Sequence, residues 1–174
     1  MEGGAVAKPL SGDQVKRIGG PGTQVLRYPD LAQYGSWDEL MGSSGKVAVL
    51  FCTDSPTDGH WLAAFNGPDG PHVFDPLGVA LDAERRYLAA GMAATLGEQN
   101  AQFARLLRTQ PAKVHVSRID FQEDKPGVNT CGRWSGLRLQ KSGMTDDDFS
   151  DFVEEGFDSS PGQTADQWVV SVTG

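Results

Sequence analysis

Apolar residues gather in short blocks after residue 45, and clusters of Gly, Pro and Asp separate these blocks. Residues 47–52 form a continuous apolar run typical of a buried strand, and residues 61–65 and 72–74 predict two further strands. The segments between these runs are short and rich in turn residues, so we expect three adjacent antiparallel strands. A weaker alternation over residues 113–121 predicts a fourth strand.

Helical patterns dominate the second half of the chain. Residues 81–107 carry apolar positions at helical spacing and predict one interrupted helix or two, with a break at Gly97. A helix over residues 131–139 is expected to end at Gly143, and residues 145–155 predict an acidic amphipathic helix. Two short helical turns are expected earlier, at residues 28–31 and 36–41.

This order of elements indicates an α+β fold, in which helices flank a central mixed or antiparallel sheet. Residues 1–24 are rich in Gly, Pro and small polar residues without a sustained period, so we expect a flexible arm there. Residues 25–174 should form a single domain, because 174 residues with 39% apolar content suit one hydrophobic core.

The chain is acidic, with 23 Asp and Glu against 15 Lys and Arg. Nucleic-acid binding is therefore not expected, despite a local group of basic residues at Arg105, Arg108, Lys113 and Arg118. No apolar run approaches the roughly 20 residues that span a bilayer, and the first residues do not resemble a signal peptide. We expect a protein that is neither exported nor membrane-bound.

Two cysteines, Cys52 and Cys131, are too few for a disulfide framework, which indicates a reducing compartment. Cys52 ends an apolar run and is expected to be a buried small hydrophobic residue, or alternatively a redox-sensitive neighbour of the active site. Cys131 opens the predicted 131–139 helix, where the helix dipole would stabilise a thiolate. Asn129 or Thr130 is expected to cap this helix, and Gly132 would leave its N–H groups open to an oxyanion.

Cys131 and His60 are the candidate nucleophile and base. An imidazole that folding brings beside a thiol is the usual means of forming a thiolate at neutral pH. Asp75, at the end of the third predicted strand, would hold the imidazole in the required tautomer. The sequence thus predicts a cysteine hydrolase with the triad order His, Asp, Cys, which is the reverse of the papain order and excludes papain itself.

Each candidate also has a structural interpretation. A histidine taken alone is more often structural than catalytic, and we assign no function to His72 and His115. Asp58 is close enough in sequence to His60 to rival Asp75 as its partner. A zinc site made from both cysteines with His60 and His72 is conceivable by residue type. No paired Cys or His spacing supports such a site, so no metal or cofactor is expected.

Four short motifs occur in one order, namely His60-Trp61, Asp75, Gln122 and Cys131-Gly132. This order resembles the adenovirus-type maturation protease family, adenain, with its relatives among large DNA viruses and the SUMO-deconjugating proteases. The stretch from Asp75 to Gly78 is similar to the viral branch, and residues 166–173 resemble the short terminal strand of some viral members. The resemblance covers roughly residues 45–174, and a loop insertion at residues 123–127 would explain the long spacing between Gln122 and Cys131.

The resemblance implies a papain-like fold and a virus-encoded cysteine endopeptidase that trims capsid or core precursor proteins. It implies that Gln122 supplies an oxyanion-hole amide, and that Trp61, Gly132 and Trp134 line the substrate cleft. Relatives cleave at Gly-rich sites, so Gly-Gly pairs at residues 3–4 and 19–20 are candidates for self-processing. The expected location is the virion or the cytoplasm or nucleus of a host cell, and the need for an activating peptide is left open.

Three other functions share these features. A deubiquitinase or SUMO-type protease would use the same triad and also cut after Gly-Gly. A Cys-dependent acetyltransferase would need a site for acetyl-coenzyme A, and this acidic chain shows no evident basic site for it. A non-catalytic binding module would carry an unreactive Cys131.

Overall fold

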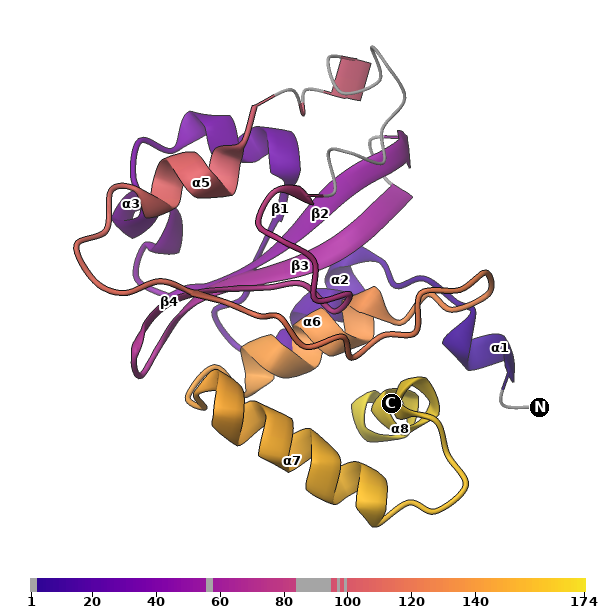
Figure 1. Cartoon of the computed structure of the whole chain (residues 1–174). Coiled ribbons are helices and arrows are strands. Elements are labelled where there is room, and N and C mark those ends of the chain that lie inside the picture. The colour runs from indigo at the N-terminus through magenta and orange to yellow at the C-terminus, as the bar shows by residue number, and fades with distance from the viewer. Residues whose placement is uncertain (1–2, 56–57, 84–94, 97, 99) are drawn as a thin grey trace.

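A five-stranded mixed sheet forms the centre of the protein. The computed structural model describes residues 3–55, 58–83, 95, 96, 98 and 100–174 (Figure 1). The strands lie in chain order, β1 (Gln24–Arg27), β2 (Lys46–Ser55), β3 (Asp58–Gly67), β4 (Gly70–Phe74) and β5 (His115–Val116). The predicted antiparallel pairing of β2, β3 and β4 is confirmed, whereas β1 runs parallel to β2 and β5 runs parallel to β4.

Helices cover both faces of this sheet. On one side lie the 3-10 helix η1 (Tyr28–Gln33), α3 (Trp37–Met41) and α5 (Gln102–Leu107). On the other side lie α2 (Gly12–Gly19) and α6 (Cys131–Gln140), with α7 (Asp146–Asp158) and α8 (Ala165–Thr173) outside α6 (Figure 1). The architecture is therefore α+β with helices flanking a mixed sheet, and among the described residues no helix is long and apolar enough to cross a membrane.

Strand β2 is apolar from Val47 to Cys52, where both of its faces are buried. Val47 and Val49 point into the cluster below η1, α3 and α5, whereas Ala48 and Leu50 join the cluster beneath α6. Alternation of side chains across a strand places them on opposite faces in this way. The core is thus two packed layers that share one sheet.

The N-terminal segment differs from the flexible arm that the sequence predicts for residues 1–24. A short helix α1 (Gly3–Val6) precedes α2, and the Ser11 hydroxyl accepts a hydrogen bond from Gln14 N as part of a capping box. Val15 is fully buried and Ile18 nearly so, and both pack in the cluster beneath α6. Residues 12–19 are therefore part of the domain core rather than an arm.

Two further predictions on secondary structure are wrong. The closing stretch is the helix α8 rather than a short strand, and its capping box joins Thr164 and Gln167. The predicted strand over residues 113–121 is limited to the two residues of β5. Beyond β5 the chain is held by isolated hydrogen bonds, such as the one from Ser117 N to Val73 O at 3.1 Å. Of the predicted helix over residues 81–107, α5 is present, while residues 84–94, 97 and 99, including the expected break, lie outside the described part.

Candidate active site

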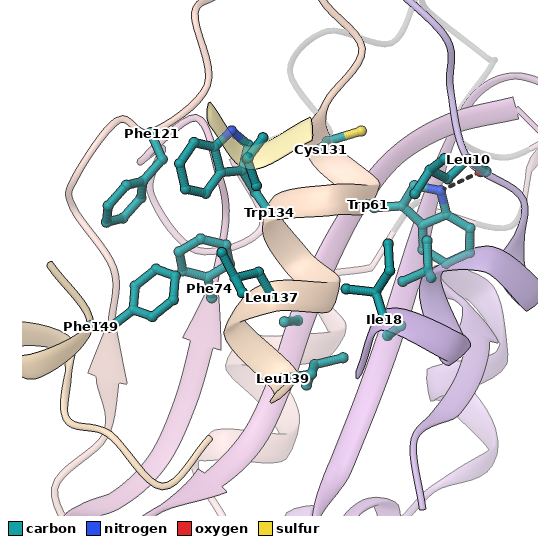
Figure 2. Close-up of a cluster of buried hydrophobic side chains, with 14 of the residues drawn as sticks. Leu10, Ile18, Trp61, Phe74, Phe121, Cys131, Trp134, Leu137, Leu139 and Phe149 are labelled. Atoms are coloured by element: carbon teal, nitrogen blue, oxygen red, sulfur yellow. Dashed lines mark hydrogen bonds between the residues drawn. The ribbon is translucent and has the colours of Figure 1, made fainter. Parts of the chain in front are cut away.

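Cys131 is the first residue of α6, as the sequence predicts, and it is 6% exposed. In Figure 2 it lies at the top of this helix, between Trp134 on one side and Trp61 on the other. Thr130, one of the two residues predicted to cap α6, occupies the N-cap position, but its side chain makes no capping hydrogen bond. The Thr130 hydroxyl donates to the Asp166 carboxylate instead, and the Asn129 amide donates to Ala7 O at 2.8 Å. No side chain caps the helix at Thr130, and the main-chain N–H of Gly132 interacts with the Cys131 thiol.

His60 lies near the start of β3, and Asp75 directly follows the end of β4. Because these two strands form an antiparallel hairpin, both residues lie at the same end of the sheet. His60 Nε2 is 2.7 Å from Asp75 Oδ1, and the two side chains are 13% and 6% exposed. This contact places Asp75, as predicted, beside His60, while the side chain of its rival Asp58 lies outside the described part.

The electrostatics of His60 and Cys131 favour an ion pair. Burial alone lowers the pKa of His60, but its hydrogen bonds with Asp75 and Cys131 outweigh burial and raise that pKa well above its usual value. Burial raises the pKa of the Cys131 thiol, but the hydrogen bond with His60 and the main-chain N–H groups of Trp61 and Gly132 lower it overall. Since Nε2 faces Asp75, Nδ1 is the ring nitrogen left for the sulfur.

A tight turn fixes the carboxylate of Asp75. Its Oδ1 also accepts a hydrogen bond from Leu77 N at 2.8 Å, and its main-chain carbonyl accepts one from Gly78 N at 2.9 Å. Gly78 has a φ of +65°, and a Cβ there would lie 2.9 Å from the main chain of Ile119. A glycine is required at this position for both reasons, which explains the end of the Asp-Pro-Leu-Gly motif.

Gln122 is buried on the loop that leads to Cys131. Pro76 O accepts hydrogen bonds from the N–H groups of Phe121 and Gln122 at 2.9 and 3.0 Å, so the Asp75 turn also positions this loop. The Gln122 amide Nε2 donates to Val128 O at 3.4 Å, and its Oε1 is buried without a hydrogen-bond partner. The side chain of Gln122 is thus held from within the loop. Among the hydrogen bonds of the described residues, its amide makes none with Cys131.

The other predicted substrate residues lie in the core. Trp61 is 5% exposed, and its indole donates to Leu10 O at 3.0 Å (Figure 2). Trp134 is fully buried and packs against Phe121 and Trp168, so it supports the site from below and offers no surface to a substrate. A Cβ built on Gly132 would lie 3.1 Å from both Leu10 Cβ and Trp61 Cδ1. The region around Gly132 is therefore narrow and closed by core side chains.

An open hollow of about 470 Å³ lies beyond this narrow region. Leu10 and Trp61, which crowd Gly132, also line it, together with Leu50. Arg27 and Asp30 add two charged side chains to its wall. Trp61, which directly follows His60, is the lining residue nearest in sequence to the candidate triad, and neither His60 nor Cys131 lines the hollow.

Asp166 supports the site and was missed by the sequence analysis. Its carboxylate is buried and accepts hydrogen bonds from Trp134 Nε1 at 3.1 Å and from Glu123 N at 3.0 Å, as well as from the Thr130 hydroxyl. It therefore ties α8 to the chain on both sides of the 123–130 loop. In the sequence, Asp166 is recognisable only as an acidic residue shortly after the Thr164 cap. Such residues are common in the first turn of surface helices, so this position does not indicate a buried supporting role.

Cys52 lies apart from His72 and His115. Cys52 is 1% exposed, as expected for a buried hydrophobic residue, and its burial with the adjacent Glu98 carboxylate raises its pKa to about 12. His72 stacks on His115 at the far end of the β3–β4 hairpin. The conceivable zinc site from both cysteines with His60 and His72 is therefore not assembled.

Comparison with known proteins gives one distant relative. The chain is 26% identical over 133 residues to the uncharacterized protein V9 of the Sputnik virophage, a match that spans 76% of this chain and 75% of V9. No family model matches the chain. No solved structure matches it either.

Proposed function

We propose that this protein is a cysteine endopeptidase with a papain-like α+β fold, in which Cys131 is the nucleophile, His60 the general base and acid, and Asp75 the residue that orients the imidazole. The pairing of Cys131 with a His60 that Asp75 holds at 2.7 Å carries the proposal. A structural histidine does not need a thiolate partner at a helix N-terminus. Such a pair is the arrangement that activates a thiol for attack.

The chemistry follows from these positions. The Cys131 thiolate attacks the substrate carbonyl carbon, and the resulting oxyanion is stabilised by the Gly132 N–H and, after a shift of its amide, by Gln122. The C–N bond then breaks as the His60 imidazolium gives its proton to the leaving amine. Water attacks the thioester while His60 accepts its proton, and the C–S bond breaks to restore the ion pair.

A preference for Gly-rich sites is proposed from the resemblance of the four motifs to the adenain family. The similarity to a virophage protein accords with a viral source, and we propose capsid or core precursor proteins as substrates in a reducing virion or host compartment. Of the two self-processing candidates, Gly19 is buried in α2 with its carbonyl bonded to Lys46 Nζ at 2.9 Å, which favours the pair at residues 3–4.

Labelling with a Gly-Gly vinyl-sulfone or aldehyde probe tests this function. The wild-type protein should be captured at Cys131, and His60→Ala should slow capture about 100-fold or more, since general-base catalysis contributes on that scale. Cys131→Ala is the control for labelling elsewhere. Equal rates in the wild type and His60→Ala, or no capture at Cys131, would favour a non-catalytic binding module. Ubiquitin and SUMO conjugates, tested alongside Gly-rich peptides, separate a deconjugating protease from a maturation protease.

A further inference from the structure

A second cluster of ligand-type side chains lies at the opposite end of the β3–β4 hairpin from Cys131. It contains Asp69, His72 and His115, and one side-chain ligand atom from each lies within 4.8 Å of the others. Asp69 Oδ1 is 2.5 Å from His72 Nε2, and Asp69 Oδ2 is 3.3 Å from His115 Nε2. The Nε2 atoms of His72 and His115 thus both lie close to the Asp69 carboxylate.

The sheet register brings the cluster together. His72 on β4 pairs directly with His115 on β5, so the two imidazoles project from the same face of adjacent strands. Asp69 comes from the turn between β3 and β4. A Cβ on Gly67 would lie 2.7 Å from the His72 ring, so the glycine before the turn makes room for that imidazole.

Two carboxylates face the ring nitrogens of His72. Its ring is 1% exposed and stacks between Phe65 and His115. Asp146 Oδ1 lies 3.3 Å from Nδ1 and accepts a hydrogen bond from Arg138 at 3.2 Å, so a fixed carboxylate faces this nitrogen. Metal-binding histidines commonly direct their second ring N–H at a carboxylate in this way, which leaves the other nitrogen as a lone pair. With a proton on Nδ1, the Nε2 lone pair would be available to a metal ion bound beside the Asp69 carboxylate.

We propose that Asp69, His72 and His115 form a binding site for a divalent transition-metal ion, with zinc the best match. Two imidazoles and one carboxylate are a zinc ligand set, and water fills the fourth position. Zinc–ligand bonds of about 2.0 to 2.2 Å place tetrahedral ligand atoms about 3.4 Å apart, so the 2.5 Å contact between Asp69 and His72 must open by about 0.9 Å to admit the ion. Asp69 and His115 are 32% and 18% exposed in their side chains and are the members that move.

The bound ion is a structural clamp and takes no part in catalysis. Along β3, Phe65 lies roughly 16 to 17 Å from His60 at about 3.3 Å per residue, and Phe65 stacks on His72. Strand β5 has only two residues and begins the segment that continues to Gln122 and Cys131. An ion that joins His115 to the β3–β4 turn would fix the start of that segment on the sheet.

Zinc titration of the Cys131→Ala protein tests the site, because this background removes the reactive thiol as a competing ligand. Isothermal titration calorimetry should give one zinc ion per chain, and the melting temperature should rise with zinc concentration. In the same background, Asp69→Asn and His115→Ala should each weaken binding at least about tenfold. The matched control is His60→Gln, which removes the third histidine of the chain and should leave zinc affinity unchanged.

Three results would overturn the site. In the first two, zinc produces neither heat nor a melting shift, or binding persists unchanged in both Asp69→Asn and His115→Ala. Loss of binding in His60→Gln would place the ion at the other end of the sheet and would equally contradict it. Asp69 and His115 are chosen because both are partly exposed, whereas His72 is part of the core. The test does not use peptidase activity, so its outcome is independent of the proposed function.

Discussion

The Ser135 hydroxyl donates a hydrogen bond of 3.0 Å to the main-chain carbonyl of Trp61. Ser135 lies one helical turn after Cys131 on α6, and Trp61 directly follows His60 on β3. This single bond therefore joins the helix that carries the thiol to the strand that carries the imidazole. Both groups are buried, so the bond is shielded from competing water.

Replacing Ser135 with Ala should lower stability by about 1 to 3 kcal/mol, because it leaves the buried Trp61 carbonyl without its partner. The spacing between Cys131 and His60 should loosen as well, so capture by the Gly-Gly probe should slow even where the protein remains folded. Urea unfolding and probe labelling measure the two effects. Ser142→Ala, just beyond α6, is the control and should change stability by less than about 0.5 kcal/mol. A neutral Ser135→Ala would show that the two elements are held by packing alone.

The Cys131 thiol should react with iodoacetamide well below the pH at which an ordinary thiol reacts. Its pKa is lowered by His60, and a lowered acid pKa means that the thiolate persists as pH falls until the folded-state pKa is reached. His60→Ala should remove this advantage and move the rate profile up toward the ordinary thiol pKa of about 8.5. Alkylation rates between pH 4 and 9, read at Cys131 by mass spectrometry, give the profile. If the wild type and His60→Ala gave the same rate profile, an ion pair between Cys131 and His60 would be contradicted.

Cys52 should remain unmodified under the same conditions. Its pKa of about 12 leaves it almost entirely protonated at neutral pH, and its side chain is 1% exposed. Peptide mapping after brief alkylation should find label on Cys131 alone in the folded protein and on both cysteines in urea. Rapid native labelling of Cys52 would instead support the redox-sensitive role that the sequence left open.

The arrangement of His60, Asp75 and Cys131 was predictable because it depends on local patterns. Two short turns between apolar runs imply a meander, and a meander places the start of β3 and the end of β4 at one end of the sheet, with His60 and Asp75 there. Cys131 follows from helix-start signals in its own segment. Asp166 was not predictable in the same way, since its three partners lie on α6 and the preceding loop, far away in sequence.

The two termini show why the remaining elements escaped prediction. Helix α8 carries Val169, Val170 and Val172, which favour strands, but packing of Trp168 and Val169 in the core outweighs that propensity. Helix α2 has eight residues and would be marginal alone, so its stability comes from a partner that its own sequence does not reveal.

That partner is the glycine face of α6, which a methyl group should disrupt. A Cβ on Gly136 would lie 2.8 Å from Ile18 Cβ, so Gly136→Ala should push α2 away and cost about 1 to 3 kcal/mol. Gly143→Ala is the matched control, because nothing lies within 4 Å of a Cβ there. Thermal unfolding and proteolysis near residue 20 measure the effect. Equal stability of the two variants would mean that the N-terminal segment is loosely attached after all.

Gly78→Ala should damage both stability and the site. The backbone at Gly78 is left-handed, which costs an alanine about 1 to 2 kcal/mol, and the added methyl would also meet the Ile119 main chain at 2.9 Å. Gly162 has a φ of +85° with no atom within 4 Å of its Cβ position, so Gly162→Ala carries the conformational cost without the clash. The difference between the two free energies of unfolding isolates the contact with Ile119.

The same substitution distinguishes a turn that only connects strands from one that positions reacting groups. Asp75, which contacts His60, begins the turn, and Pro76 O accepts the hydrogen bond from Gln122 N. Displacing Gly78 should therefore move both Asp75 and Gln122, the proposed oxyanion-hole residue. Probe capture at Cys131 should therefore fall in Gly78→Ala at temperatures where it is fully folded, while Gly162→Ala should keep the wild-type rate. If the two folded variants label equally fast, the Asp75 turn is a scaffold for stability and its carboxylate does not control the reactivity of the thiol.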